Sequence, residues 1–252
     1  MAYILFDCDG TVVNSEALAM PFVANYLVDI AQKQGVTVEP DVVKNLFGKT
    51  HYEMTWLLHN IYGIKFQEGV EELMHAEVVR MLAEKATATE GMGAFLERTV
   101  CLGHQPVIVT SSALDRVVPS LKRAGVFRYF QKDAEELIFS AVSTLDPPEP
   151  KPSPAIYHFI LNKLGIKPDE TIAFEDSGSG VESADAANVP VIGYLGGSHI
   201  NGNQNAIGNQ LISKGAKALI SSWEEAERYL PPLAHKPAKH PRAPLFPKRD
   251  YC

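Results

Sequence analysis

The sequence predicts an α/β protein with a parallel β-sheet core, helices on both faces of the sheet and an inserted all-helical segment. Short apolar runs rich in β-branched and aromatic residues recur along the chain, and helical patterns separate them, which indicates a parallel sheet. The alternation breaks between residue 14 and about residue 88, where the patterns are helical only. This stretch predicts the inserted segment.

Five runs have the length and composition of strands that are buried on both faces of a sheet. They are residues 3–6, 106–110, 137–141, 171–175 and 190–194. Ser112 is expected to begin a helix with a variant of the capping box, and Gly125 to end it. Ser153-Pro154 is expected to begin another helix, which Gly165 ends. This alternation favours right-handed crossovers, which place helices on both faces of the sheet.

The inserted segment divides the chain into a core and a cap. Its helical patterns cover residues 27–33 up to Gly35, the stretch after Pro40 up to Gly48, residues 54–62 up to Gly63, and residues 70–82. We expect a core domain of residues 1–14 and 89–230, a helical cap domain of residues 15–88, and an extended, proline-rich, basic tail of residues 231–252. Because the cap leaves the core just after the first strand, it is a candidate lid over the ligand-binding edge of the sheet.

Composition excludes several classes of protein. The 252 residues are 46% hydrophobic and 21% charged, which is typical of a globular protein, and the net charge of −7 argues against nucleic acid or an anionic membrane surface as a partner. No apolar window approaches the length of a membrane span, and the first residues lack the pattern of a signal peptide. Cys8, Cys101 and Cys252 lack the spacing of a disulfide framework, so we expect a soluble cytoplasmic protein.

The run Asp7-Cys8-Asp9-Gly10-Thr11 directly follows the first predicted strand. Two carboxylates at the end of a buried strand repel each other and lose solvation, so the pair requires a cation. Carboxylates can also attack an electrophile covalently or transfer a proton. By strand alternation Cys8 points away from the two acids, and we expect it to pack in the core.

Three further polar motifs follow predicted strands. Thr110-Ser111-Ser112 offers hydroxyls and free backbone N–H groups to an anion, Lys151 lies in an extended Lys-Pro-Ser-Pro stretch, and Glu175-Asp176 adds two more acids. Each motif alone is also compatible with an ordinary cap, surface lysine or loop. Because parallel strands bring their carboxyl ends to one edge, the four motifs together predict a site for a dianion and a hard divalent cation.

The order of these motifs resembles the haloacid dehalogenase-like superfamily, within it the phosphatases and β-phosphoglucomutases that carry a helical cap. Asp7-Cys8-Asp9-Gly10-Thr11 is similar to the first motif of the family, Thr110 to the second, Lys151 to the third and Glu175-Asp176 to the fourth. The resemblance covers roughly residues 3–230 and implies a Rossmann-like α/β core with an inserted helical cap.

The resemblance also implies a role for each residue. Asp7 would attack the phosphorus of a phosphomonoester and form an aspartyl phosphate; its ordinary pKa, far below neutrality, would leave it ionised. Asp9 would protonate the leaving alkoxide and then activate water. Mg²⁺ would be held by the carboxylates of Asp7 and Asp176, the backbone carbonyl of Asp9, and Glu175 nearby or through water. Phosphoryl oxygens would bind Thr110 and the Ser111 amide, and Lys151 would offset negative charge.

Substrate choice is expected to come from the cap. Gly48, Lys49 and His51 lie where the family carries a specificity loop, so they are candidate substrate contacts, with a solvated helix end as the alternative. In the same segment, the helical spacing of Met54, Trp56, Leu58 and Ile61 predicts the core of the cap.

The chain also departs from the family pattern. Asn14 replaces a common Asp, and residues 145–150 form an unusually long proline-rich approach that could shift Lys151. We expect His199, on a glycine-rich turn, to be an ordinary loop residue rather than part of the site.

These observations predict a Mg²⁺-dependent phosphatase that hydrolyses a small phosphorylated metabolite, such as a sugar phosphate, a polyol phosphate or a phosphoglycolate-like compound. The acid at position 9 argues against a dehalogenase, because a departing halide needs no proton. A phosphosugar mutase and a non-catalytic phosphate-binding protein are the alternatives. We expect a monomer or a homodimer.

Overall fold

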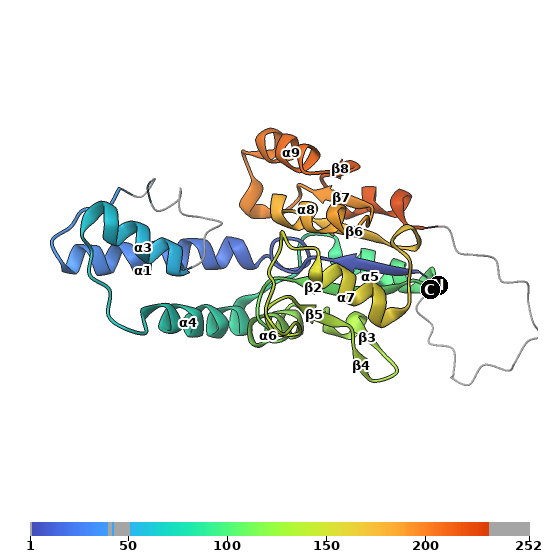
Figure 1. Cartoon of the computed structure of the whole chain (residues 1–252), viewed down its shortest axis with the longest axis horizontal. Coiled ribbons are helices and arrows are strands. Elements are labelled where there is room, and N and C mark those ends of the chain that lie inside the picture. The colour runs from blue at the N-terminus through green and yellow to red at the C-terminus, as the bar shows by residue number, and fades with distance from the viewer. Residues whose placement is uncertain (1, 40–41, 43–50, 232–252) are drawn as a thin grey trace, which may run out of the picture.

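The computed structural model describes residues 2–39, 42 and 51–231. Apart from Val42, the helix predicted between Pro40 and Gly48 lies outside the described residues, as does all of the predicted tail except Pro231. A parallel sheet of six strands forms the centre of the core, in the order β5-β2-β1-β6-β7-β8 (Figure 1). The strands are β1 (Tyr3–Phe6), β2 (Gln105–Thr110), β5 (Ile138–Ser140), β6 (Ile172–Glu175), β7 (Val191–Tyr194) and β8 (Ala218–Ile220).

The structure confirms the five predicted strands and adds three short ones. β8 has three residues, too few for its sequence to be distinguished from a loop or helix end. β3 (Gln131–Lys132) and β4 (Glu135–Glu136) form a small antiparallel hairpin outside the main sheet. Their charged residues give no apolar run, so the sequence pattern contained no signal for them.

Side chains alternate between two apolar layers along each central strand. Ile4 and Phe6 of β1 pack into one layer, and Leu5 packs into the other. The first layer is covered by α5 (Met92–Cys101), α6 (Leu114–Arg123) and the 3-10 segment η4 (Trp223–Tyr229). The second is covered by α7 (Ala155–Leu164), α8 (Gly178–Ala186) and α9 (Gln204–Ser213). The predicted three-layer α/β architecture is therefore confirmed.

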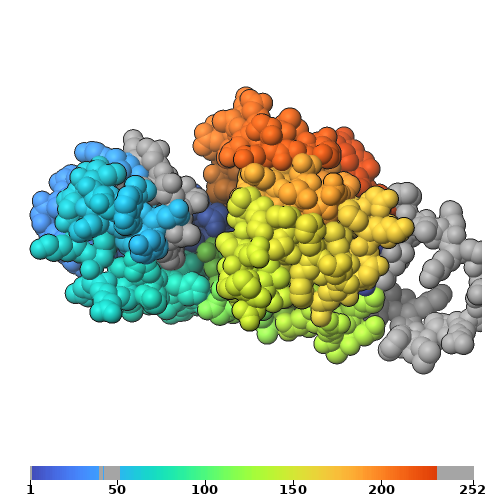
Figure 2. All heavy atoms as spheres, in the orientation of Figure 1, coloured from blue at the N-terminus to red at the C-terminus, as the bar shows by residue number. Residues whose placement is uncertain are grey.

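Three helices extend away from the sheet. They are α1 (Ser15–Lys33), α3 (His51–Tyr62) and α4 (Val70–Lys85), which lie together at one end of the molecule (Figure 1) and form a separate lobe in the space-filling view (Figure 2). Helix α1 begins twelve residues before the predicted stretch, with Pro21 inside it. No helix among the described residues combines the length and apolar character needed to cross a bilayer.

The predicted apolar core of the cap is only half correct. Met54 and Leu58 are buried, but 54% of Trp56 and 61% of Ile61 are exposed. Met54 and Leu58 are four residues apart and share one face of α3, whereas Trp56 lies about 200° around the helix from Met54. The prediction placed all four residues on one face of the helix because they are close in sequence. For Trp56 this was wrong.

The two connections between the helical lobe and the sheet lie side by side. Val13 and Ala88 form an antiparallel bridge, and the Thr89 amide donates a hydrogen bond to the Val12 carbonyl at 3.0 Å. The Thr89 hydroxyl donates to the Thr11 carbonyl at 2.7 Å, and in turn accepts a hydrogen bond from the Trp223 indole at 2.9 Å. Through Thr89, the second connection is therefore hydrogen-bonded both to the first motif and to Trp223 of the apolar layer.

Candidate active site

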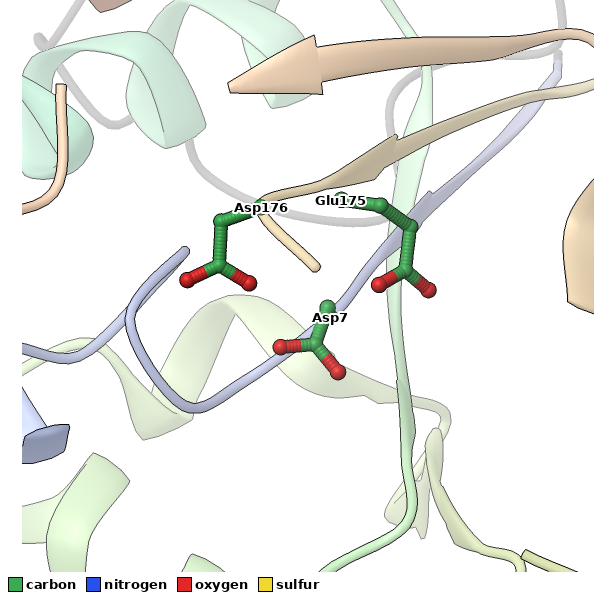
Figure 3. A group of neighbouring side chains, drawn as sticks. All are labelled: Asp7, Glu175 and Asp176. Carbon is green, nitrogen blue, oxygen red and sulfur yellow. The ribbon is translucent and has the colours of Figure 1, made fainter. Parts of the chain in front are cut away.

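The strand order brings the predicted motifs to one edge of the sheet. β1 pairs with β2 on one side and with β6 on the other, so Asp7 lies between Thr110 and the Glu175-Asp176 pair. Figure 3 shows the side chains of Asp7, Glu175 and Asp176 converging beyond the ends of their strands. Open α/β sheets bind ligands at this edge of the sheet.

Lys151 is buried in the centre of this group, with only 3% of its side chain exposed. Its ammonium donates to Oδ1 of Asp7 at 2.8 Å, to Oε1 of Glu175 at 2.6 Å and to the carbonyl of Val109 at 2.7 Å. Burial lowers the pKa of Lys151, but Asp7 and Glu175 raise it more, so the net pKa lies above its ordinary value. The long approach through residues 145–150 does not displace this lysine from the predicted site.

Asp7, Glu175 and Asp176 each offer a carboxylate oxygen, and these oxygens lie within 4.8 Å of one another. All three residues are buried, and Oε2 of Glu175 has no hydrogen-bond partner among the described residues. One ammonium cannot balance three carboxylates in this setting. Oxygen donors, excess negative charge and an unpartnered buried acceptor fit a hard divalent cation such as Mg²⁺.

The expectation that Asp7 keeps its ordinary pKa is wrong for the metal-free chain. Burial raises the pKa of Asp7 well above its usual value; Lys151 lowers it, and Glu175 and Asp176 raise it further. Glu175 is shifted in the same direction, chiefly by burial, although Lys151 and a hydrogen bond from Tyr157 oppose the shift. Burial therefore penalises the ionised forms of Asp7 and Glu175, and a cation beside Lys151 would relieve that penalty.

Asp9 lies in a separate network that the sequence pattern did not indicate. Its Oδ1 accepts a hydrogen bond from the Arg116 guanidinium at 2.9 Å, and its Oδ2 accepts one from the Ser112 hydroxyl at 2.5 Å. The same guanidinium nitrogen lies 3.1 Å from Glu16 in the first turn of α1. Burial raises the pKa of Asp9, but Arg116 and the hydrogen bonds lower it more, so the net pKa lies below its usual value.

The position of Arg116 in the sequence is compatible with the site but does not identify it. It is one helical turn after Ser112, so its side chain lies over the start of α6 and faces the same edge of the sheet. A charged residue in a helix is common, however, and nothing in the local pattern separates a buried arginine from an exposed one.

The second motif is placed as predicted, but its hydroxyls have different roles. Thr110 is buried, and its hydroxyl accepts a hydrogen bond from the Ser112 amide at 3.0 Å. The Ser111 hydroxyl accepts one from the Lys151 amide at 3.0 Å, which positions that lysine. Ser112 does not form the predicted capping box: Ala113 is the N-cap, and the Leu114 amide donates instead to the Ser143 hydroxyl at 3.2 Å. The Ser112 hydroxyl instead donates a hydrogen bond to Asp9.

His199 was predicted to be an ordinary loop residue, and this was wrong. Its Nε2 lies 3.0 Å from Oδ2 of Asp176, and 16% of its side chain is exposed. Burial lowers the pKa of His199, but Asp176 and Glu16 raise it more, so the net pKa is above its usual value. Cys8, by contrast, is buried in the apolar layer as expected, and burial raises the pKa of its thiol well above the usual value.

The predicted cap contacts are described only in part. Gly48 and Lys49 lie outside the described residues, and His51 is the first residue of α3. The structure therefore adds nothing to the prediction that these three residues contact substrate.

Comparisons with known proteins indicate a family for this chain. A family model described as haloacid dehalogenase-like hydrolase matches residues 4–194. The chain is 26% identical to the phosphorylated carbohydrates phosphatase of Thermotoga maritima, over 89% of this chain and 96% of that protein. It is 31% identical to hexitol phosphatase A of Escherichia coli, over 75% of this chain and 80% of that protein.

A solved structure shares the fold. It is a conserved haloacid dehalogenase-like protein of unknown function from Agrobacterium tumefaciens, 24% identical, with a TM-score of 0.75 over 91% of this chain and 97% of that one.

Proposed function

The chain belongs to the haloacid dehalogenase-like hydrolase family and is a hydrolase acting on phosphomonoesters, and we propose that it is a Mg²⁺-dependent phosphatase of small phosphorylated carbohydrates that reacts through an aspartyl phosphate. The observation that carries the proposal is the buried cluster in which Lys151 contacts both Asp7 and Glu175, with Asp176 beside them. A cationic side chain and a divalent cation on one group of acids suit a phosphoryl dianion.

Asp7 is the proposed nucleophile. Its carboxylate lies beyond the end of β1, and one oxygen is held by Lys151, which orients the other. Attack on phosphorus forms an O–P bond and breaks the bond to the leaving alkoxide. Asp7, Asp176 and the Asp9 carbonyl would hold Mg²⁺, with Glu175 nearby or through water. The bound ion would supply charge neutralisation at the phosphoryl oxygens.

Asp9 is the proposed proton carrier. It would donate a proton to the leaving alkoxide, and as a carboxylate it would then take a proton from the water that hydrolyses the aspartyl phosphate. The Arg116 and Ser112 contacts hold both of its oxygens, so the position of this carboxylate is well determined. The Thr110 hydroxyl and the Ser111 amide would bind phosphoryl oxygens, and Lys151 would offset the negative charge.

The helical segment is the proposed cap domain, spanning residues 15–88 and closing over the site. Its two connections lie beside the first motif, which allows a movement of the lobe to reach the crevice. The names of the two curated relatives support a sugar or polyol phosphate as substrate. The substrate contacts proposed for Gly48, Lys49 and His51 lie in this domain.

The decisive experiment is a phosphate-release screen over sugar phosphates, polyol phosphates, phosphoglycolate and nucleotides, with Mg²⁺ or with EDTA. We expect Mg²⁺-dependent release from a sugar or polyol phosphate, none from Asp7→Asn, and strongly slowed release from Asp9→Asn with metal binding retained. A folded, metal-loaded protein that releases no phosphate from any compound would overturn the phosphatase. Isomerisation that depends on a bisphosphate would indicate a mutase, and phosphate binding without turnover would indicate a binding protein.

A further inference from the structure

His199 lies close to the proposed metal site, although it follows a different strand. It is in the 3-10 turn η3 (Ser198–Ile200), which comes after β7, and its Nε2 lies 3.0 Å from Oδ2 of Asp176. A carboxylate only accepts hydrogen bonds, so the ring nitrogen that faces it carries the proton whatever the charge of the ring. His199 therefore engages one of the two Asp176 oxygens.

Glycines on two loops make room for this contact. A Cβ on Gly10, where φ is +81°, would overlap Oδ2 of Asp176 and lie 2.6 Å from Cε1 of His199. A Cβ on Gly197 would lie 2.6 Å from Cε1 of His199 and 2.9 Å from the Gly10 carbonyl. Neither position can carry a side chain without moving the imidazole or the carboxylate. The first motif, the β7 loop and Asp176 therefore meet at the His199 ring.

The turn that carries His199 is itself anchored. The Ser198 hydroxyl donates to Oδ1 of Asn14 at 3.1 Å, and Nδ2 of Asn14 donates to the Ala88 carbonyl at 3.3 Å. An amide can accept on one side and donate on the other, whereas an aspartate at this position would only accept. Asn14 is itself part of the first connection to the helical lobe. Because it is an amide where the family commonly has Asp, its side chain can bind the turn through Ser198 and the second connection through Ala88.

We propose that His199 is a positioning residue for the metal, which rests on the proposed function in so far as Asp176 is a ligand. Figure 3 shows one Asp176 oxygen directed toward Asp7 and the other directed away from it. By holding Oδ2, His199 restricts rotation of the carboxylate and leaves Oδ1 for the cation. An outer partner of this kind affects metal affinity without binding the metal itself.

The test is direct metal binding, measured by isothermal titration of the full metal-free chain with Mg²⁺ and with Mn²⁺. His199→Met keeps much of the side-chain volume and removes the donor, and we expect a Kd about 10- to 100-fold weaker. His199→Gln keeps an amide donor near the position of Nε2, and we expect it to stay within about threefold of the original chain. His158 is exposed on α7, so His158→Met is the matched control with unchanged affinity.

The outcomes separate this inference from the proposed function. If the original chain binds Mg²⁺ and His199→Met binds it equally well or more tightly, the positioning role is wrong and the metal site stands. If the original chain binds neither ion, the metal site itself fails, and the inference fails with it. Saturating Mg²⁺ should restore most of the turnover of His199→Met, which a merely structural defect would not allow. Should His199→Met fail to fold, the comparison of His199→Gln with His199→Asn, whose shorter amide cannot reach Oδ2, decides the question.

Discussion

The guanidinium of Arg116 contacts Asp9 and Glu16 at once, at 2.9 Å and 3.1 Å. Glu16 is in the first turn of α1, so one arginine on α6, with 16% of its side chain exposed, joins the proposed proton carrier to the base of the helical lobe. Arg116 is held by these two acids, and its Nε has no partner among the described residues. The arginine therefore holds one oxygen of Asp9 and is the largest of the contributions that lower its pKa.

Substitution of Arg116 by Met should change the pH dependence of catalysis. Burial raises the pKa of Asp9 and Arg116 lowers it, so removing the arginine leaves burial less opposed and the pKa rises. Asp9 then keeps its proton to a higher pH. We expect the alkaline limb of kcat/KM for an alkyl phosphate to move upward by about one pH unit or more, as is usual when a nearby opposite charge is lost.

Two comparisons make this prediction specific. p-Nitrophenyl phosphate has a leaving group that needs no proton, so its kcat/KM profile should not show the same movement. Arg98→Met removes an exposed arginine that pairs with Glu227 and should leave both profiles unchanged. A profile that stays in place for the alkyl phosphate in Arg116→Met would contradict the role given to Arg116.

Asp7→Asn should stabilise the chain in the absence of metal. Burial raises the pKa of Asp7, so its carboxylate is penalised in the folded state at pH values above that pKa. The penalty disappears as the pH falls below the unfolded pKa of about 3.9. At neutral pH in EDTA, we expect the free energy of unfolding of Asp7→Asn to exceed that of the original chain by about 1 kcal/mol or more. This difference should shrink toward pH 4.

Mg²⁺ should reverse this order of stability. Binding to the folded state raises the melting temperature of the original chain, whereas Asp7→Asn has lost a ligand and should respond weakly. Melting curves in EDTA and in Mg²⁺ at several pH values measure both effects. Equal stabilisation of the two chains by Mg²⁺ would show that Asp7 is not a ligand.

Lys151→Met should destabilise the fold more than an ordinary ion-pair mutation does. Its removal leaves the carboxylates of Asp7 and Glu175 buried without their cation, at a cost of about 3–5 kcal/mol. Glu175→Gln on the same chain removes one of the two charges and should recover part of the loss, with a coupling energy of about 1–3 kcal/mol. Urea denaturation of the single and double variants in EDTA measures that coupling.

A more exposed ion pair is the control for the cost of Lys151→Met. Lys214 and Glu182 are in contact at 2.6 Å with 43% and 45% of their side chains exposed, so Lys214→Met should cost about 1 kcal/mol or less. If Lys151→Met costs no more than Lys214→Met, the buried cluster does not carry the strong coupling inferred from its geometry.

The site residues that could be predicted from the sequence are those that directly follow a predicted strand. Asp7, Thr110 and Glu175 each follow a buried apolar strand, and parallel pairing alone brings such ends together. Arg116 and His199 were not predicted as site residues, because their contacts depend on how a helix and a turn pack over that edge. The miss at Trp56 has a different cause: Trp56 lies about 200° around α3 from Met54, so helical periodicity itself places it on another face.

Gly10 gives a test of the site that removes no ligand. At φ +81° an alanine is strained, and its Cβ would overlap the Asp176 oxygen that His199 holds. Gly35 has a similar φ of +74°, and a Cβ added there would meet nothing within 4 Å, so Gly35→Ala carries the same backbone strain without the collision. We expect each alanine to cost about 1 kcal/mol or more of stability from strain alone.

Only Gly10→Ala should also weaken Mg²⁺ binding, because displacement of the Asp176 carboxylate by even about 1 Å disturbs a site that demands near-ideal geometry. Titration calorimetry of both variants with Mg²⁺, beside their urea denaturation curves, separates the two effects. Unchanged Mg²⁺ affinity in a folded Gly10→Ala protein would mean that Asp176 can move away from His199 and still bind the metal. Such a result would argue against a fixed orientation of this carboxylate, whereas loss of affinity confined to Gly10→Ala would place the first motif and Asp176 in one rigid metal site.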